Sequence, residues 1–231
     1  MANKEEIVRL LKDKSVMKQN VYRNTLQTFD MFKKVAREIT DELKSEAKDI
    51  DRRIVVDYMQ PGDYEMEIKV AGDVLVFYMH TNVFEFEKSH PMYKTGYVKE
   101  NNNNSYCGII QVYNFLSDSF KYNRVNDLGY LIGRIFVNQE SKFFIESKPT
   151  MGYKFQNFSH HPIDEAVIRD IINELIVYCL SFDLYTPPSD AVKEITLHEI
   201  QERIQSDKFK TGKRLGFRSQ NDTVIGDDIN F

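Results

Sequence analysis

His160 and His161 are the only adjacent histidines in the chain, and Asp164 and Glu165 follow them closely. Two imidazoles and two carboxylates are residue types that can bind a metal ion or move protons. A zinc site, however, needs three or four converging ligands, and adjacent side chains point in different directions on both strands and helices. We therefore expect no metal site in this stretch.

The same stretch fits the beginning of a helix. Pro162 suits the first helical position, where a missing N–H costs little, and Asp164 and Glu165 would fall in the favourable first turn. Ser159 or His161 would then be the capping residue. This interpretation gives an ordinary structural role to every polar residue of the stretch except His160.

The remaining candidates for catalysis are isolated. Cys107 and Cys179 are too few for a thiolate zinc cage or a disulfide scaffold, and we expect both to be reduced and buried. His198 lacks the second histidine of the zinc-protease pattern, because Glu202 stands at that position. The chain also has no complete phosphate-loop or G-x-S-x-G motif. Catalytic residues stay unassigned, no cofactor is expected, and a non-enzyme is favoured.

One segment near the C-terminus carries unbalanced positive charge. Residues 207–219 contain five cations, one acid and two interleaved phenylalanines. The cations are Lys208, Lys210, Lys213, Arg214 and Arg218. Such a segment can bind phosphates and stack on bases. It can also dock its phenylalanines on its own domain, or bind a partner protein, and all three alternatives stay open.

The whole-chain charge gives no further support to nucleic-acid binding. The 231 residues include 31 Lys and Arg against 35 Asp and Glu, a net charge of −4. This balance does not steer the protein toward nucleic acid or membrane. The longest apolar runs are about five residues, against about 20 for a membrane helix, and the N-terminus lacks a signal-peptide core. We expect a cytoplasmic protein that does not bind membranes.

The first 50 residues predict a long amphipathic helix. Apolar residues recur every three or four positions, and no proline or glycine occurs before Pro61. The stripe comprises Tyr22, Leu26, Phe29, Phe32, Ala36, Ile39, Leu43, Ala47 and Ile50. A helix over residues 17–50 would be about 50 Å long. It must lie along a wide sheet, pair with the shorter helix at 4–14, or meet a second copy.

We expect part of residues 17–50 to form the interface of a homo-oligomer. The expected interface residues are Phe29, Phe32, Ile39 and Leu43.

The middle of the chain predicts strands. Residues 64–70 alternate strictly between apolar and polar, and residues 73–80 are apolar at nearly every position. The second pattern is typical of a strand covered on both faces. Further strand patterns lie at 82–88, 106–116, 129–137 and 141–148, with no crossover helix between them, so neighbours should be antiparallel. A sheet that curls around a helix could also leave a ligand cavity.

Smaller features and the C-terminal region complete the expected fold. The four asparagines at 101–104 suggest a hairpin tip, and Gly129 and Gly133 suggest a bulge or close packing. A helix from Pro162 to about residue 184 and a second one at 190–206 would follow the sheet. The predicted fold class is α+β: an antiparallel meander of about six to eight strands, packed against a long N-terminal helix and a C-terminal helical pair.

These patterns divide the chain into an N-terminal helical segment (1–50), an α+β core (51–206) and a tail (207–231). The favoured function is a non-catalytic binding or regulatory module that acts through self-association and a protein or small-ligand partner. The alternative is an enzyme acting on a nucleic-acid or phosphorylated substrate, or a nucleic-acid-binding protein that uses the basic segment.

If the basic segment binds nucleic acid, its affinity for single-stranded DNA must fall steeply with salt, because binding releases counterions. Replacing Lys213, Arg214 and Arg218 by alanine should remove about three phosphate contacts. The slope of log affinity against log salt concentration should then become shallower by roughly 0.7 for each lost contact. Deleting residues 207–231 should abolish binding. Fluorescence anisotropy with a labelled oligonucleotide measures both effects, and equal binding by the truncated chain would rule the segment out.

Overall fold

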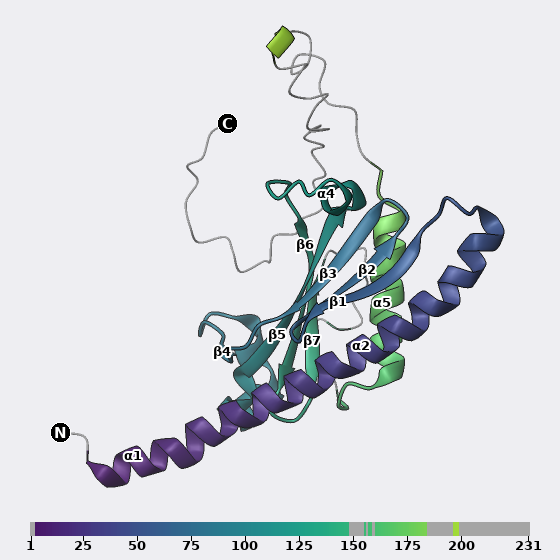
Figure 1. The fold of residues 1–231 in the computed structure, drawn as a ribbon. Helices are drawn as coiled ribbons and strands as arrows, with labels where there is room; N and C mark the ends of the chain where they lie inside the picture. Colours follow the sequence, from purple (N-terminus) through teal and green to yellow (C-terminus); the bar gives the residue numbers. More distant parts are fainter. Residues whose placement is uncertain (1–2, 148–154, 156, 159, 184–195, 199–231) are drawn as a thin grey trace.

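The computed structural model describes residues 3–147, 155, 157–158, 160–183 and 196–198. Its centre is a seven-stranded sheet in which every paired neighbour is antiparallel (Figure 1). The strands are β1 (Val56–Gly62), β2 (Glu65–Val70), β3 (Asp73–Met79), β4 (Phe84–Glu85), β5 (Tyr106–Leu116), β6 (Tyr130–Asn138) and β7 (Phe143–Ser147). Their spatial order is β1-β2-β3-β5-β6-β7, and the short β4 pairs with β5. The predicted α+β class, strand number and antiparallel meander are confirmed.

The N-terminal helix is a single long element in three parts. These are α1 (Lys4–Leu10), a π-helical turn η1 (Leu11–Ser15) and α2 (Val16–Ile50). With no proline or glycine to interrupt it, the backbone stays helical at both junctions. Figure 1 shows α2 crossing one side of the sheet, while α1 extends beyond the sheet.

The second long helix, α5 (Glu165–Leu180), begins later than predicted. Its N-cap is Asp164, whose carboxylate accepts a hydrogen bond from the backbone N–H of Val167 at 2.8 Å. Pro162 therefore precedes the helix, and neither Ser159 nor His161 is the cap. An Asp carboxylate is among the best acceptors for these unpaired N–H groups, which explains the later start. Most of the predicted helix at 190–206 lies outside the described residues.

The two long helices pack beside each other on one face of the sheet, here called the inner face. The side chains of Phe29, Phe32 and Ile39 are buried in this core, and Leu43 packs against it. From α5, Ile168, Ile172 and Leu175 are buried in the same core. The long helix thus shares one hydrophobic core with the sheet.

Salt bridges join the two helices at their exposed edges. Arg169 of α5 contacts Glu38 at 3.1 Å and Glu42 at 3.0 Å, and Lys34 of α2 contacts Glu165 at 2.7 Å. Exposed pairs such as these contribute little individually, about 0–1 kcal/mol. They fix the pairing of two helices whose apolar sides supply most of the stability.

The segment between β4 and β5 contains the four asparagines, and it is not a hairpin tip. It folds into η2 (Pro91–Lys94), α3 (Gly96–Glu100) and η3 (Asn102–Ser105). Asn104 is buried, donates to the carbonyl of Tyr97 at 3.2 Å and accepts from Gln139 at 3.0 Å. Asparagine amides that satisfy buried backbone groups stabilise short irregular elements, so this tract is part of the folded structure.

The strand glycines lie where the prediction placed a bulge or close packing. Gly133 lies at a register shift between β5 and β6, and the ring of Phe115 covers Gly129. Another glycine, Gly108 in β5, marks the point where α2 approaches the sheet most closely. A Cβ on Gly108 would lie 2.2 Å from the Oγ1 of Thr25, which is itself buried and bonded to the carbonyl of Val21.

Replacing Gly108 by alanine should therefore destabilise the fold. Overpacking of this kind lowers the free energy of unfolding by about 1–3 kcal/mol. Each kcal/mol lost lowers Tm by about 2–4 °C in a chain of this length. Gly133→Ala is the matched control, because its nearest contact would be an ordinary 3.8 Å. Thermal unfolding followed by circular dichroism compares them. Equal Tm values for the two variants would contradict the close crossing.

Candidate interaction surface on the outer face of the sheet

The outer face of the sheet, opposite α2 and α5, carries more apolar residues than a solvent-exposed sheet face normally does. Along β3, Leu75, Phe77 and Met79 belong to the inner core, so Val74, Val76 and Tyr78 point outward. The sequence predicts cover on both faces of this strand. Within the described residues, helices longer than five residues cover only the inner face.

The segment from Phe86 to Ser105 covers one end of the outer face. Its residues form a second buried cluster with Cys107, Phe136 and Phe144. The ring of Phe86 lies 4.9 Å from that of Phe136 and 5.6 Å from that of Phe144, between ring centroids. This aromatic cluster fixes the segment on the sheet, and among the described residues no comparable cover lies over the other part of the outer face.

His90 anchors this segment through both of its ring nitrogens. Its Nδ1 accepts a hydrogen bond from the N–H of Met92 at 3.2 Å, so the neutral ring carries its proton on Nε2. Nε2 lies 3.4 Å from Oε1 of Glu146, to which it can donate. With both nitrogens engaged, His90 is suited to holding the segment in place and is poorly placed to exchange protons with a substrate.

Glu146 lies between His90 and Arg134, which forms an ion pair with it. Burial acts to raise the pKa of Glu146. The hydrogen bond with His90 and the positive charge of Arg134 outweigh burial, so the pKa is lower than that of an ordinary glutamate. Glu146 is thus an ionised, structural carboxylate with its charge compensated.

The part of the outer face that lies beyond this segment is built from two rows of cross-strand neighbours. Glu67, Val76, Tyr113 and Leu131 form one row, and Glu65, Tyr78, Gln111 and Arg134 form the next. Directly opposite residues in such rows are close enough for their side chains to touch. We call Glu65, Glu67, Val76, Tyr78, Tyr113 and Leu131 the outer-face patch.

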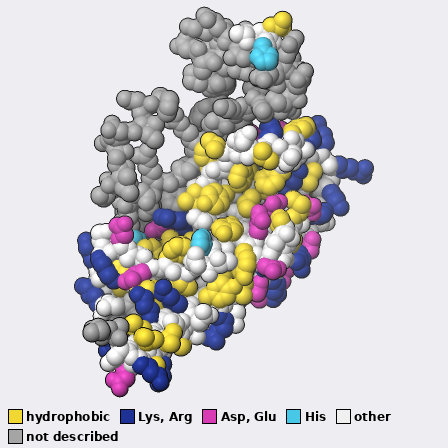
Figure 2. Space-filling model, turned by 60° about the vertical axis from the view of Figure 1, so that its left-hand side comes forward, with side chains coloured by type: hydrophobic (Ala, Val, Ile, Leu, Met, Phe, Trp, Pro, Cys, Tyr) yellow, Lys and Arg dark blue, Asp and Glu magenta, His cyan; other side chains and the backbone are white. Residues whose placement is uncertain are grey.

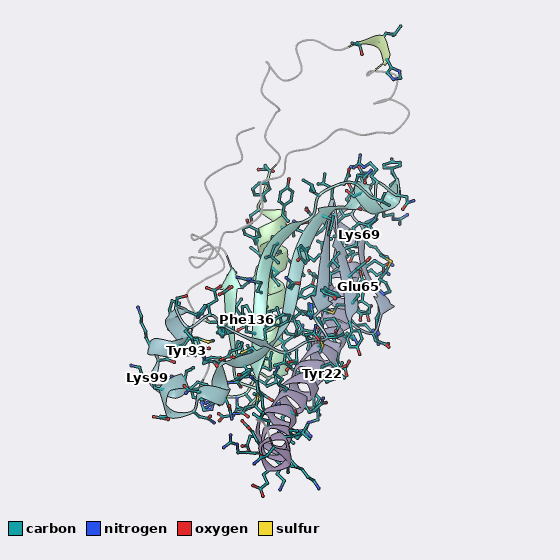
Figure 3. All side chains as sticks on the ribbon, turned by 90° about the vertical axis from the view of Figure 1, so that its left-hand side faces the viewer. Tyr22, Glu65, Lys69, Tyr93, Lys99 and Phe136 are labelled. Carbon is teal, nitrogen blue, oxygen red and sulfur yellow. The ribbon has the colours of Figure 1, made fainter. Side chains whose placement is uncertain are left out.

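The pictures show how this surface is arranged. Figure 2 shows hydrophobic side chains gathered over the middle of the molecule's visible face, with acidic side chains beside them. In Figure 3, Glu65 and Lys69 lie toward the right of the view and Tyr93 and Lys99 toward the left, with Phe136 between them. The patch thus lies next to the covered aromatic cluster and is not part of it.

Glu67 is the unusual residue of the patch. It is only 6% exposed, and neither it nor Glu65 forms an ion pair with any cation of the described chain. Burial, followed by the negative charge of Glu65, raises the pKa of Glu67. A buried carboxylate without a cation is costly, and it is commonly paired when it is retained.

Tyrosine rings beside carboxylates suit a cationic ligand. Lysine and arginine side chains are attracted to the faces of Tyr78 and Tyr113 and to the charges of Glu65 and Glu67. The same carboxylates repel phosphate groups, so the patch is a poor surface for nucleic acid. Lys69, which follows on the same strand, lies near Asp57 and leaves the two glutamates uncompensated.

A shallow groove of about 230 Å³ between α2 and β1 is a weaker candidate. Its charges are already engaged: Lys44 contacts Asp57 at 2.9 Å, and the guanidinium of Arg37 lies 5.1 Å from the ring centre of Tyr58. A ligand would have to break these contacts before making its own. The groove does not have the size expected for the predicted ligand cavity.

The other sequence-predicted residues do not form a site in the described structure. His160 and His161 are exposed, and no group of three His, Cys, Asp or Glu in the described chain could hold a metal ion. Cys107 is fully buried and burial raises its thiol pKa, so it is not an activated nucleophile. The five cations of residues 207–219 lie outside the described residues.

The four residues predicted to form an oligomer interface lie inside the fold. Phe29, Phe32 and Ile39 are fully buried against the sheet, and Leu43 is partly buried there. They serve the intramolecular core, which was the alternative explanation of the stripe. A second copy cannot reach the three buried residues while α2 is packed on the sheet.

Comparison with known proteins gives no further assignment. No family model, no curated protein and no solved structure matches this chain. Within the described ranges, no helix combines the length and the apolar character needed to cross a membrane.

The raised pKa of Glu67 predicts a pH-dependent effect of Glu67→Gln. At pH 7 the wild-type carboxyl is charged and partly desolvated, and this penalty disappears as the pH falls through its raised pKa toward the ordinary value of about 4.3. The variant should therefore have a higher Tm than wild type at pH 7, and this gain should shrink near pH 4. Differential scanning calorimetry measures the difference in Tm between variant and wild type at each pH. Glu174→Gln on α5 is the control for removing one charge. A lower Tm for Glu67→Gln at pH 7 would show that the carboxylate is already stabilised.

Proposed function

We propose that this protein is a non-catalytic binding module that docks a basic segment of a partner protein on its outer-face patch. The observation that carries the proposal is the nearly buried side chain of Glu67, whose carboxylate pairs with no described cation and lies beside an aromatic and aliphatic surface. A lysine or arginine from a partner would supply the missing positive charge. The aliphatic part of its side chain would lie against Tyr113 and Leu131, which are half-buried.

The charge of the patch decides between possible partners. Two outer faces of this protein placed against each other would bring Glu65 and Glu67 of both copies together, which like-charge repulsion disfavours. Nucleic acid is disfavoured for the same reason. A basic polypeptide is attracted. In an extended segment that alternates lysine with apolar residues, the lysines all point to one side and can face the patch together.

The alternative of an enzyme has less support from the arrangement of the described residues. His90, a half-buried histidine, uses both ring nitrogens to hold the segment from Phe86 to Ser105. Glu146 is neutralised by Arg134. These groups explain the stability of the sheet's second cluster without a reaction. The cytoplasmic location and the nucleic-acid alternative remain predictions from sequence.

A labelled eight-residue peptide that alternates lysine with valine or phenylalanine tests the proposal. It should bind the full chain with a Kd on the order of 10–100 µM in fluorescence anisotropy. Two lost cation contacts of about 0.5–1 kcal/mol each should weaken binding roughly fivefold to thirtyfold in Glu65→Gln/Glu67→Gln. The same peptide with glutamate in place of lysine should not bind.

Asp170→Asn/Glu174→Gln is the matched control, because it removes two exposed carboxylates from α5 on the other side of the molecule. It makes the same change in net charge and should retain wild-type affinity. Equal loss in both double variants would reduce the effect to net charge alone. No binding by the wild-type protein at low salt would overturn the proposal.

A further inference from the structure

Helix α5 ends at the level of the outer-face patch, on the opposite face of the sheet. Near its end, Sγ of Cys179 lies 3.0 Å from the side-chain nitrogen of Asn114 on β5. Asn114 directly follows Tyr113, which belongs to the same row of the patch as Glu67. The chain that continues beyond α5 therefore starts close to this row, separated from it by the thickness of the sheet.

This continuation contains the basic segment of residues 207–219, whose lysines match the spacing of the patch glutamates. Lys208 and Lys210 are two positions apart. Glu65 and Glu67 have the same separation on β2. Side chains two residues apart on an extended chain lie on one side, about 6.6 Å from each other. Both lysines can therefore contact both glutamates at the same time, each with one partner.

We propose that the basic segment of this chain occupies the outer-face patch of the same chain. Lys208 and Lys210 contact the two patch glutamates, and an external basic polypeptide must displace them. This occupation depends on the proposed function, because the patch must bind basic polypeptide in general before it can bind its own.

The connecting residues are long enough for this contact. Fully extended, residues 184–207 reach about 80 Å, at about 3.3 Å per residue. If the predicted helix at 190–206 forms, it spans about 25 Å and the other connecting residues add about 20 Å. Packed layers of secondary structure lie about 10 Å apart, so both lengths allow the segment to pass from α5 to the outer face.

The covalent connection makes even a weak contact effective. A short flexible linker gives an effective concentration on the order of 1 mM. With a single lysine–phenylalanine–lysine repeat, the segment should have a Kd of about 100 µM, at the weak end of the range expected for the designed peptide. The segment then occupies most patches, and an added peptide binds about tenfold more weakly than it would to a free patch. A second copy would compete equally only near 1 mM protein.

Zero-length crosslinking of the wild-type full chain tests the contact directly. A carbodiimide joins a lysine to a carboxylate only where the two are in contact, and mass spectrometry identifies the joined residues. In the monomer at low salt, Lys208 or Lys210 should be joined to a patch glutamate. The yield should fall as salt screens the attraction.

Two other crosslinking results would overturn the proposal. Lysines joined to the patch glutamates only in a covalent dimer would show that the segment of a second copy occupies the patch. Lysines joined to Asp222, Asp227 or Asp228, and not to the patch, would show that the tail folds back on its own acidic end.

The labelled peptide that alternates lysine with valine or phenylalanine measures the competition. In Lys208→Gln/Lys210→Gln the segment loses both contacts, so the peptide should bind about fourfold to eightfold more tightly than to wild type. Lys4→Gln/Lys12→Gln is the matched control, because it removes two exposed cations from the N-terminal end of the helix with the same change in net charge. It should bind the peptide as wild type does.

These results separate the contact of the basic segment from the proposed function. Equal peptide binding by wild type and both variants, without crosslinks to the patch, overturns the contact and leaves the patch as a site for a partner. Crosslinks to the patch without peptide binding by any of the three proteins retain the contact and overturn the partner site.

Discussion

The close packing of α2 on the inner face of the sheet determines the rest of the architecture. The helix crosses β5 at Gly108, where the absence of a side chain lets Thr25 contact the strand backbone. From this crossing the apolar stripe of α2 packs against the inner residues of the sheet. Helix α5 packs beside α2 on the same face. Because one continuous core contains both helices and the strands, movement of α2 would expose the largest aromatic side chains of the protein.

Placing both long helices on one side has a consequence for the other side. Central antiparallel strands with apolar residues at nearly every position need cover on two faces, and the described structure supplies full cover on only one. The segment from Phe86 to Ser105 buries Phe136 and Phe144, while the rows that contain Tyr78 and Tyr113 remain partly accessible. Such a surface is typical of an interaction site, because a sheet without a partner would carry polar residues there.

The polar groups of this protein fall into two kinds. His90, Glu146 and Arg134 compensate one another, and the asparagine amides near the β6–β7 turn bond to backbone groups. These satisfied groups stabilise the fold and give the half-buried His90 and the buried Asn104 and Asn138 a structural role. Glu67 and Glu65 are of the other kind, since no described cation pairs with them. Uncompensated charge, more than residue type, distinguishes the surface proposed to bind a partner.

Much of the fold follows from sequence periodicity. The alternation through residues 64–70 gives β2 and correctly places Glu65 and Glu67 on the side away from the core, because strand side chains alternate by geometry. The three- and four-residue spacing gives α2, and a long helix without proline or glycine has no reason to break before Ile50. The sequence pattern predicts the ends of helices less exactly than their existence. The cap of α5 is Asp164, which lies after the residues predicted to cap it.

Only the tertiary structure could decide which surfaces each pattern serves. The stripe containing Phe29, Phe32 and Ile39 is equally compatible with a dimer and with a core, because periodicity gives the apolar side of a helix but not its partner. Similarly, the acidic character of Glu67 is visible in the sequence, but its burial depends on Val76 and Tyr113 from strands that pair with β2 across long stretches of chain. The sequence therefore determined the elements and their apolar sides, through local geometry that repeats every two or 3.6 residues. The pairing of distant segments decided which side chains are buried, which charges are compensated and which apolar residues remain exposed.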